Sequence, residues 1–333
     1  MTGLPFHLDW IQWLFDHRVE PLTVVFQSFT WLGELEGVVL LIALVFAAFD
    51  KRLAFRLAWV TLIAMLSNHL LKTLIANPRP FVTAGTYREH WAVSERRASE
   101  LVTEYSTPSG HAMGGAAFWG FLYGQARRRW ARLGCVAAIL GTGLSRPYLG
   151  VHYVEDIALG WPLGLAVAAV ATRHGDGIAR RWNAIPIRGR IAIAVASSVA
   201  VWVLTRGLLG WGSMGQPSAF VSYAGFLTGL VVAEPLEAAY VRFDPRAGTP
   251  LQKIARFVLG VAAILCPLVL LGPVFAAIAP DATPLGDLLR YVRYASASAI
   301  GLFLAPLVFV RCGLARRAAP AGERSERDAA ARS

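Results

Sequence analysis

Two apolar segments of this chain are joined by the stretch Ser145-Arg146-Pro147-Tyr148-Leu149-Gly150-Val151-His152-Tyr153-Val154-Glu155-Asp156. Charged side chains at a membrane edge are costly to keep, so this cluster points to a function. His152 and Asp156 are four residues apart, which places them on one face of a helix. A carboxylate there can accept the proton of one ring nitrogen and leave the other nitrogen free to attack. Arg146 adds a planar cation suited to phosphate oxygens. The alternative is an ion pair at a helix start that only orients a loop.

The composition indicates a membrane protein with many spans. The 333 residues are 56% hydrophobic, and the mean hydropathy is +0.49, which is too apolar for an ordinary soluble domain. The formal net charge is +11, and the basic residues lie in short loops between apolar segments, as cytoplasmic loops of membrane proteins do. A nucleic-acid-binding protein would gather such residues on one soluble face, so we expect no nucleic-acid partner.

The apolar segments predict an all-α integral membrane protein with about nine transmembrane helices. A short amphipathic helix at the membrane surface is expected first, over residues 7–16. The first expected span lies within residues 22–49 and is interrupted at Gly33 and by Glu34 and Glu36. The other expected spans cover residues 55–76, 111–126, 131–146, 156–172, 190–207, 217–236, 255–278 and 288–310.

Loop charges predict the orientation and the division of the chain. Lys and Arg concentrate in alternate loops, which the positive-inside rule places in the cytoplasm, with the N-terminus outside and the C-terminus inside. We expect the protein in the inner (cell) membrane. The expected parts are an interfacial segment over residues 1–35, a motif-bearing core over 36–172, a transmembrane extension over 173–312 and a disordered cytoplasmic tail over 313–333. In the extension, Gly225 and Gly229 allow close contact between helices.

A second stretch with candidate functional residues, Lys72 to Pro80, lies where the second expected span ends. Pro78 and Pro80 terminate that span because proline restricts the residue before it. Lys72 and Arg79 therefore lie at the outer end of the span and can bind an anion. The ordinary interpretation of Lys72 is a helix-end lysine whose ammonium group reaches the interface.

A third stretch, Pro108-Ser109-Gly110-His111, begins the third expected span. Free backbone amides at a helix start attract anions, and Gly110 allows a phosphate to approach the backbone. His111 would lie beside that anion. The ordinary interpretation is a serine N-cap next to a surface histidine.

Convergence of the three stretches favours the functional interpretation of each. The expected topology brings all their polar groups to one membrane level on the outer side. Cations, a hydroxyl group, helix-start amides and histidines together describe a phosphate site. The candidate residues are Lys72, Arg79, Ser109, Gly110, His111, Arg146, His152 and Asp156.

These motifs resemble those of the type 2 phosphatidic acid phosphatase superfamily. The shared order is Lys-x6-Arg-Pro, then Pro-Ser-Gly-His, then Ser-Arg-x5-His-x3-Asp. The resemblance covers roughly residues 36–172 and implies the helical core of that family. The wider layout, including Thr30-Trp31-Leu32-Gly33 and the further spans, resembles the sphingosine-1-phosphate phosphatase-like and glucose-6-phosphatase-like branch.

The resemblance implies a membrane phosphatase that needs no metal or cofactor. His152 would be the nucleophile, Asp156 its orienting carboxylate and His111 the general acid and base. The phosphate would be bound by Lys72, Arg79, Ser109, Gly110 and Arg146. The expected partners are a lipid phosphate monoester and the bilayer, and we infer no protein partner. The alternatives are a lipid phosphotransferase with the same phosphohistidine and a transporter of phosphorylated lipids.

Overall fold

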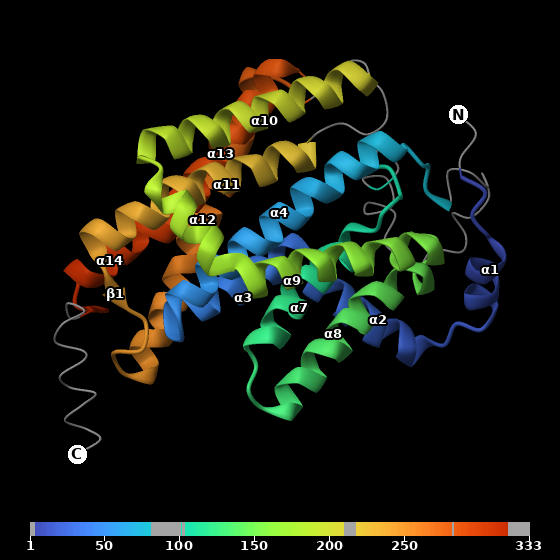
Figure 1. Ribbon diagram of the computed structural model, residues 1–333, viewed down its shortest axis with the longest axis horizontal. Coiled ribbons are helices and arrows are strands. Elements are labelled where there is room, and N and C mark those ends of the chain that lie inside the picture. The colour runs from blue at the N-terminus through green and yellow to red at the C-terminus, as the bar shows by residue number, and fades with distance from the viewer. Residues whose placement is uncertain (1–3, 81–100, 102–103, 210–217, 282, 319–333) are drawn as a thin grey trace.

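The computed structural model describes residues 4–80, 101, 104–209, 218–281 and 283–318, and these are almost entirely helical (Figure 1). The first helices are α1 (Asp9–Asp16), α2 (Glu20–Gly33), α3 (Leu35–Ala48), α4 (Lys51–Ile75), α7 (Gly110–Gln125), α8 (Arg129–Tyr148) and α9 (Val154–Ala184). The later elements are α10 (Ile187–Leu209), α11 (Ser218–Leu236), the π-helical turn η2 (Glu237–Val241), β1 (Phe243–Asp244), α12 (Pro250–Ile278), α13 (Pro284–Ala299), the π-helical turn η3 (Ile300–Leu304), α14 (Ala305–Arg311) and β2 (Arg316–Arg317).

The expected spans all fall on helices, but their number is not confirmed. Six helical units in the described part of the chain are long and apolar enough to cross a membrane, and the α2–α3 pair makes seven if it is one span. The protein is therefore a membrane protein. The expected spans outside this set are α7 and α8. The 16 residues of α7 reach about 24 Å at 1.5 Å per residue, less than a hydrocarbon core of about 30 Å.

The first expected span is broken between α2 and α3, which meet at a bend of 62°. Glu34 has extended backbone angles there, with φ −79° and ψ 158°. The turn is so tight that a Cβ atom on Gly37 would lie 2.2 Å from the carbonyl oxygen of Trp31. The interruption predicted at Gly33 is thus present. It places Gly33 against His111, since a Cβ atom on Gly33 would lie 3.0 Å from His111 Cδ2.

The centre of the core half is the packing of α7 against α4 and α9. Phe118 and Phe121 of α7 are buried together with Leu57 of α4 and Ala168 of α9. The backbones of α7 and α9 approach closely, because a Cβ atom on Gly164 would lie 2.2 Å from the carbonyl oxygen of Met113. This contact fixes the start of α7 next to the start of α9.

The extension is held by an equally close contact between α11 and α13. Cβ atoms on Gly225 and Gly229 would lie 2.5 and 2.4 Å from the carbonyl oxygens of Tyr291 and Ala295. The close helix contact predicted for the two glycines is therefore confirmed. The expected boundary after residue 172 falls inside α9, which continues to Ala184.

The chain end differs from the expected disorder. Arg316 and Arg317 form β2, which pairs antiparallel with β1. Disorder was therefore the wrong expectation for this part of residues 313–333, because hydrogen bonds between two short strands order it. Residues 319–333, and the loop over residues 81–100, lie outside the described residues.

Candidate active site

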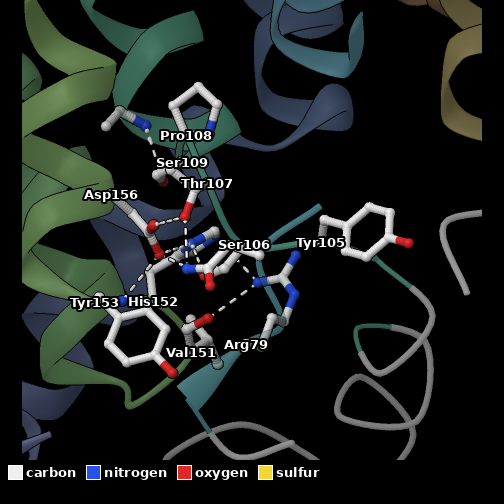
Figure 2. A network of polar contacts seen from close by, with 12 residues as sticks. Arg79, Tyr105, Ser106, Thr107, Pro108, Ser109, Val151, His152, Tyr153 and Asp156 are labelled. Carbon is white, nitrogen blue, oxygen red and sulfur yellow. Dashed lines mark hydrogen bonds and ion pairs between the residues drawn. The ribbon is translucent and has the colours of Figure 1, made fainter. Parts of the chain in front are cut away.

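His152 is held between a carboxylate and a guanidinium group. Its Nδ1 lies 3.0 Å from Asp156 Oδ2, and its Nε2 lies 3.0 Å from Arg79 Nη1 (Figure 2). An arginine can only donate hydrogen bonds and an ionised carboxylate can only accept them. The proton of the neutral ring is therefore on Nδ1, and Nε2 carries the lone pair. This is the tautomer expected from the spacing of His152 and Asp156.

Asp156 accepts hydrogen bonds from other groups besides His152. Ser106 Oγ donates to Asp156 Oδ2, Thr107 Oγ1 donates to Oδ1 at 2.5 Å, and the Tyr153 amide donates to Oδ2 at 3.0 Å. Figure 2 shows both hydroxyl groups converging on this carboxylate. Sequence reasoning missed Ser106 and Thr107. The available signal was their position directly before the Pro-Ser-Gly-His motif.

The environment of His152 lowers its pKa. The side chain is buried in the short connection between α8 and α9. Burial is the largest cause and places the pKa well below the ordinary value of 6.5. The positive charges of Arg79, Lys72 and Arg146 lower the pKa further. All of these effects favour the neutral ring, which is the nucleophilic form.

Arg79 and Lys72 are oriented by the segment that precedes the Pro-Ser-Gly-His motif. Arg79 is buried; its Nη1 also donates to the Val151 carbonyl at 3.0 Å, and its Nη2 lies 3.1 Å from Glu104 Oε2. Lys72 Nζ donates to the Tyr105 carbonyl at 2.7 Å and lies 3.8 Å from the same Glu104 oxygen. A carboxylate thus lies beside both cations. Sequence reasoning did not identify this role of Glu104.

Arg146 reaches the site from the last turn of α8. It is buried, and its Nη1 lies 3.4 Å from Thr30 Oγ1. The Thr30 hydroxyl in turn donates to Ser145 Oγ at 2.9 Å. Thr30 on α2 therefore supports the Ser-Arg pair of the third motif, so the α2 segment is part of the site's framework.

The start of α7 carries Ser109, Gly110 and His111. The Ser109 hydroxyl accepts a hydrogen bond from the Ala112 amide at 3.4 Å, and the Ser109 amide donates to the Asp156 carbonyl at 3.1 Å. Asn68 Nδ2 holds the preceding Pro108 carbonyl at 3.0 Å. Ser109 is thus the N-cap of α7.

One cavity collects most of the predicted residues, and both histidine rings line it. Ser109 is not among its lining residues, and Asp156 lies behind His152. The predicted residues that line it are Lys72, Arg79, Gly110, His111, Arg146 and His152. Six of the predicted residues, from all three sequence stretches, therefore line one cavity.

The extension also contributes to this cavity, which sequence reasoning did not foresee. Ser222, Tyr223, Arg290 and Tyr294 line it. Arg290 Nε donates to Ser222 Oγ at 2.8 Å, which joins α13 to α11 at the cavity wall. The extension is thus part of the site as well as of the fold.

Comparisons with known proteins find two family matches in separate parts of the chain. Residues 53–177 match the PAP2 superfamily, and residues 221–317 match the PAP2 superfamily phosphatase, transmembrane extension. Glucose-6-phosphatase 3 of Homo sapiens and that of Bos taurus are each 28% identical to the chain over 138 residues. These matches cover 37% of this chain and 40% of each relative, so the chain spans less than half the length of these curated relatives. No solved structure matches the chain significantly.

Proposed function

The chain belongs to the PAP2 superfamily, and from this membership we propose that it is a membrane phosphatase acting through a phosphohistidine on His152. The observation that carries the proposal is the fixed tautomer of His152. Asp156 accepts a hydrogen bond from Nδ1–H, while Nε2 accepts one from Arg79. The Nε2 lone pair becomes available to phosphorus when the Arg79 guanidinium donates to phosphate oxygens instead.

In the first half-reaction, Nε2 of His152 attacks the phosphorus atom of a phosphate monoester. The N–P bond forms and the bond from phosphorus to the ester oxygen breaks. His111, which lines the same cavity, donates a proton to the leaving alkoxide, so the first product is an alcohol. Lys72, Arg79 and Arg146 stabilise the negative charge on the phosphoryl oxygens.

In the second half-reaction, His111 takes a proton from a water molecule that attacks the phosphohistidine. The N–P bond breaks, inorganic phosphate leaves and His152 returns to its starting state. Asp156 stays ionised and stabilises the positive charge that develops on the ring. Ser109 contributes through the cap that fixes the start of α7, where the Gly110 amide faces the phosphate.

The proposed substrate is a lipid phosphate monoester that reaches the site from the bilayer. The site lies where several helices end, and the protein is a membrane protein. The proposed orientation follows from loop charge: the site faces the extracytoplasmic side of the inner membrane and the C-terminus is cytoplasmic. The two relatives are named glucose-6-phosphatase 3, so a soluble sugar phosphate belongs in the same substrate screen.

The test is phosphate release by purified protein in detergent, followed by acid quenching with a ³²P-labelled substrate. We expect inorganic phosphate from a lipid phosphate and an acid-labile label on the wild-type protein. His152→Ala should remove both the label and turnover, because no other group can replace the nucleophile.

His7→Ala is the matched control, since His7 is an exposed histidine on the N-terminal segment. It should retain turnover. Turnover by a folded His152→Ala protein at the wild-type rate would contradict the proposal. Transfer of the label to a second lipid, without free phosphate, would identify a phosphotransferase instead.

A further inference from the structure

A second cavity lies between α3, α4, α11, α12 and η3. Its walls are apolar and include Val38, Ile42, Phe46, Leu62, Phe226 and Ile264. We call it the apolar cavity. None of the eight candidate site residues is among the residues that line it.

The apolar cavity adjoins the cavity that holds the proposed phosphate site. Gly33, Leu35, Met65 and Tyr223 line both cavities. The junction lies directly beside the proposed general acid, because a Cβ atom on Gly33 would lie 3.0 Å from His111 Cδ2. An extended molecule with its phosphate among the cations could therefore pass this junction into the apolar cavity.

The length and apolar lining of the cavity suit a hydrocarbon chain. Its lining follows α3 from Leu35 to Ala47, which corresponds to about 18 Å at 1.5 Å per residue. Of its lining residues in the described part of the chain, Arg256 alone is charged. The Arg256 guanidinium donates to the carbonyls of Asp244, Pro245 and Ala247 at 3.1, 3.1 and 2.8 Å. Both Nη atoms of Arg256 are therefore engaged by backbone carbonyls, which weakens their attraction for a second polar head group.

We propose that the apolar cavity binds the hydrocarbon tail of the phosphorylated substrate while the phosphate lies among Lys72, Arg79 and Arg146. This inference rests on the proposed function and adds the shape of the substrate: a phosphate monoester on a single extended apolar chain. The PAP2 core supplies the chemistry, and the extension supplies part of the tail site, through residues such as Phe226 and Ile264.

A tail in the apolar cavity and a tail in the bilayer predict different selectivity. Lipid tails are as apolar as the cavity, so moving a tail from one to the other gains little affinity. A cavity of finite length instead sets a limit on the length and width of the tail. Activity should fall once the alkyl chain exceeds the cavity, whereas a tail that stays in the bilayer meets no such limit.

Gly260→Leu tests the cavity by filling it. Gly260 lines the apolar cavity, and a Cβ atom there would have Phe309 Cζ, at 3.9 Å, as its nearest neighbour. The added side chain therefore enters open space. We expect kcat/KM for a long-chain alkyl phosphate, divided by that for p-nitrophenyl phosphate, to fall about tenfold, because overfilled cavities reject further atoms.

Ala262→Leu is the matched control. Ala262 lies two residues further along α12 and is exposed, so the same leucine would face outward. It should keep the wild-type ratio. An unchanged ratio in Gly260→Leu, or an equal loss on both substrates, would overturn the inference.

A binding experiment separates this inference from the proposed function. An alkylphosphonate with a diazirine at the chain end cannot be hydrolysed, so its binding does not depend on turnover. Photolysis should label peptides of α3, α12 and η3. An alkyl probe without the phosphonate should label them less. Equal labelling by the probes with and without the phosphonate would show that the cavity does not hold a substrate tail. Labelling of outward-facing side chains alone would show the same. Absence of phosphate release with correct labelling would instead reject the phosphatase.

Discussion

A single carboxylate, Asp156, decides which nitrogen of His152 can react. The spacing of the two residues in the sequence predicts their contact, and the structure adds the hydroxyl groups of Ser106 and Thr107 on the same carboxylate. These donors favour the ionised form of a buried carboxylate and hold it in one orientation. Burial and the nearby cations keep the ring of His152 neutral, and the Asp156 carboxylate orients it.

The pKa of His152 can be tested directly. Its depressed pKa means that the folded protein leaves the ring neutral at pH 6.5, whereas the unfolded chain binds a proton there. We expect the ¹⁵N resonances of His152, assigned with His152→Ala, to titrate below pH 6.5. The free energy of unfolding should decrease as the pH falls below 6.5, since protons then bind the unfolded state preferentially. A titration midpoint above 6.5 would contradict the described burial and charges.

The approach of α7 to α9 places His111 and Asp156 in one site. Small residues make this approach possible, because Gly160 and Gly164 on α9 face the backbone of α7. Spacing of four residues puts both glycines on the same helix face. The sequence analysis identified such a pair in α11, where Gly225 and Gly229 pack on α13, but it did not identify the pair in α9. The contact nearest the chemistry was therefore found only in the structure.

Gly164→Ala should separate the two helices. The new Cβ atom would lie 2.2 Å from the Met113 carbonyl oxygen, so the backbones must move. We expect a loss of about 1–3 kcal/mol in stability and a lower kcat, measured by thermal unfolding in detergent and by phosphate release.

The matched control for this prediction is Gly175→Ala on the same helix. A Cβ atom on Gly175 would have no neighbour within 4 Å, so stability should stay unchanged or rise by up to about 1 kcal/mol. Equal effects of the two substitutions would show that helix propensity, and not the α7 contact, is responsible.

The molecule as a whole has its motif residues toward one end and α14 toward the other. Figure 1 shows α1 and the start of α9 on one side, and α14 with β1 on the opposite side. The loop charges that predict orientation are read from the sequence, whereas the separation of the two ends is read from the structure. Together they predict which end faces the cytoplasm.

Thiol labelling of intact cells tests this orientation. Cys312 is exposed near the chain end, and Asp9 is exposed on α1. In a Cys266→Ser background, a membrane-impermeant maleimide should label the thiol introduced by Asp9→Cys. It should label Cys312 only after the membrane is opened, because the C-terminal end is expected inside. The reverse pattern would place the site in the cytoplasm.

Sequence alone determined the helical membrane class and the three motifs, and it predicted a phosphate site at them. The length of apolar segments, the charge of loops and the spacing of residues are local properties, so they can be read directly from the sequence. Tertiary structure decided what depends on segments distant in the chain. It brought Ser106 and Thr107 to Asp156, Tyr223 and Arg290 of the extension to the phosphate cavity, and the apolar cavity to the side of His111. The physical reason is that a cavity is the space left between packed helices, and no single segment encodes that space.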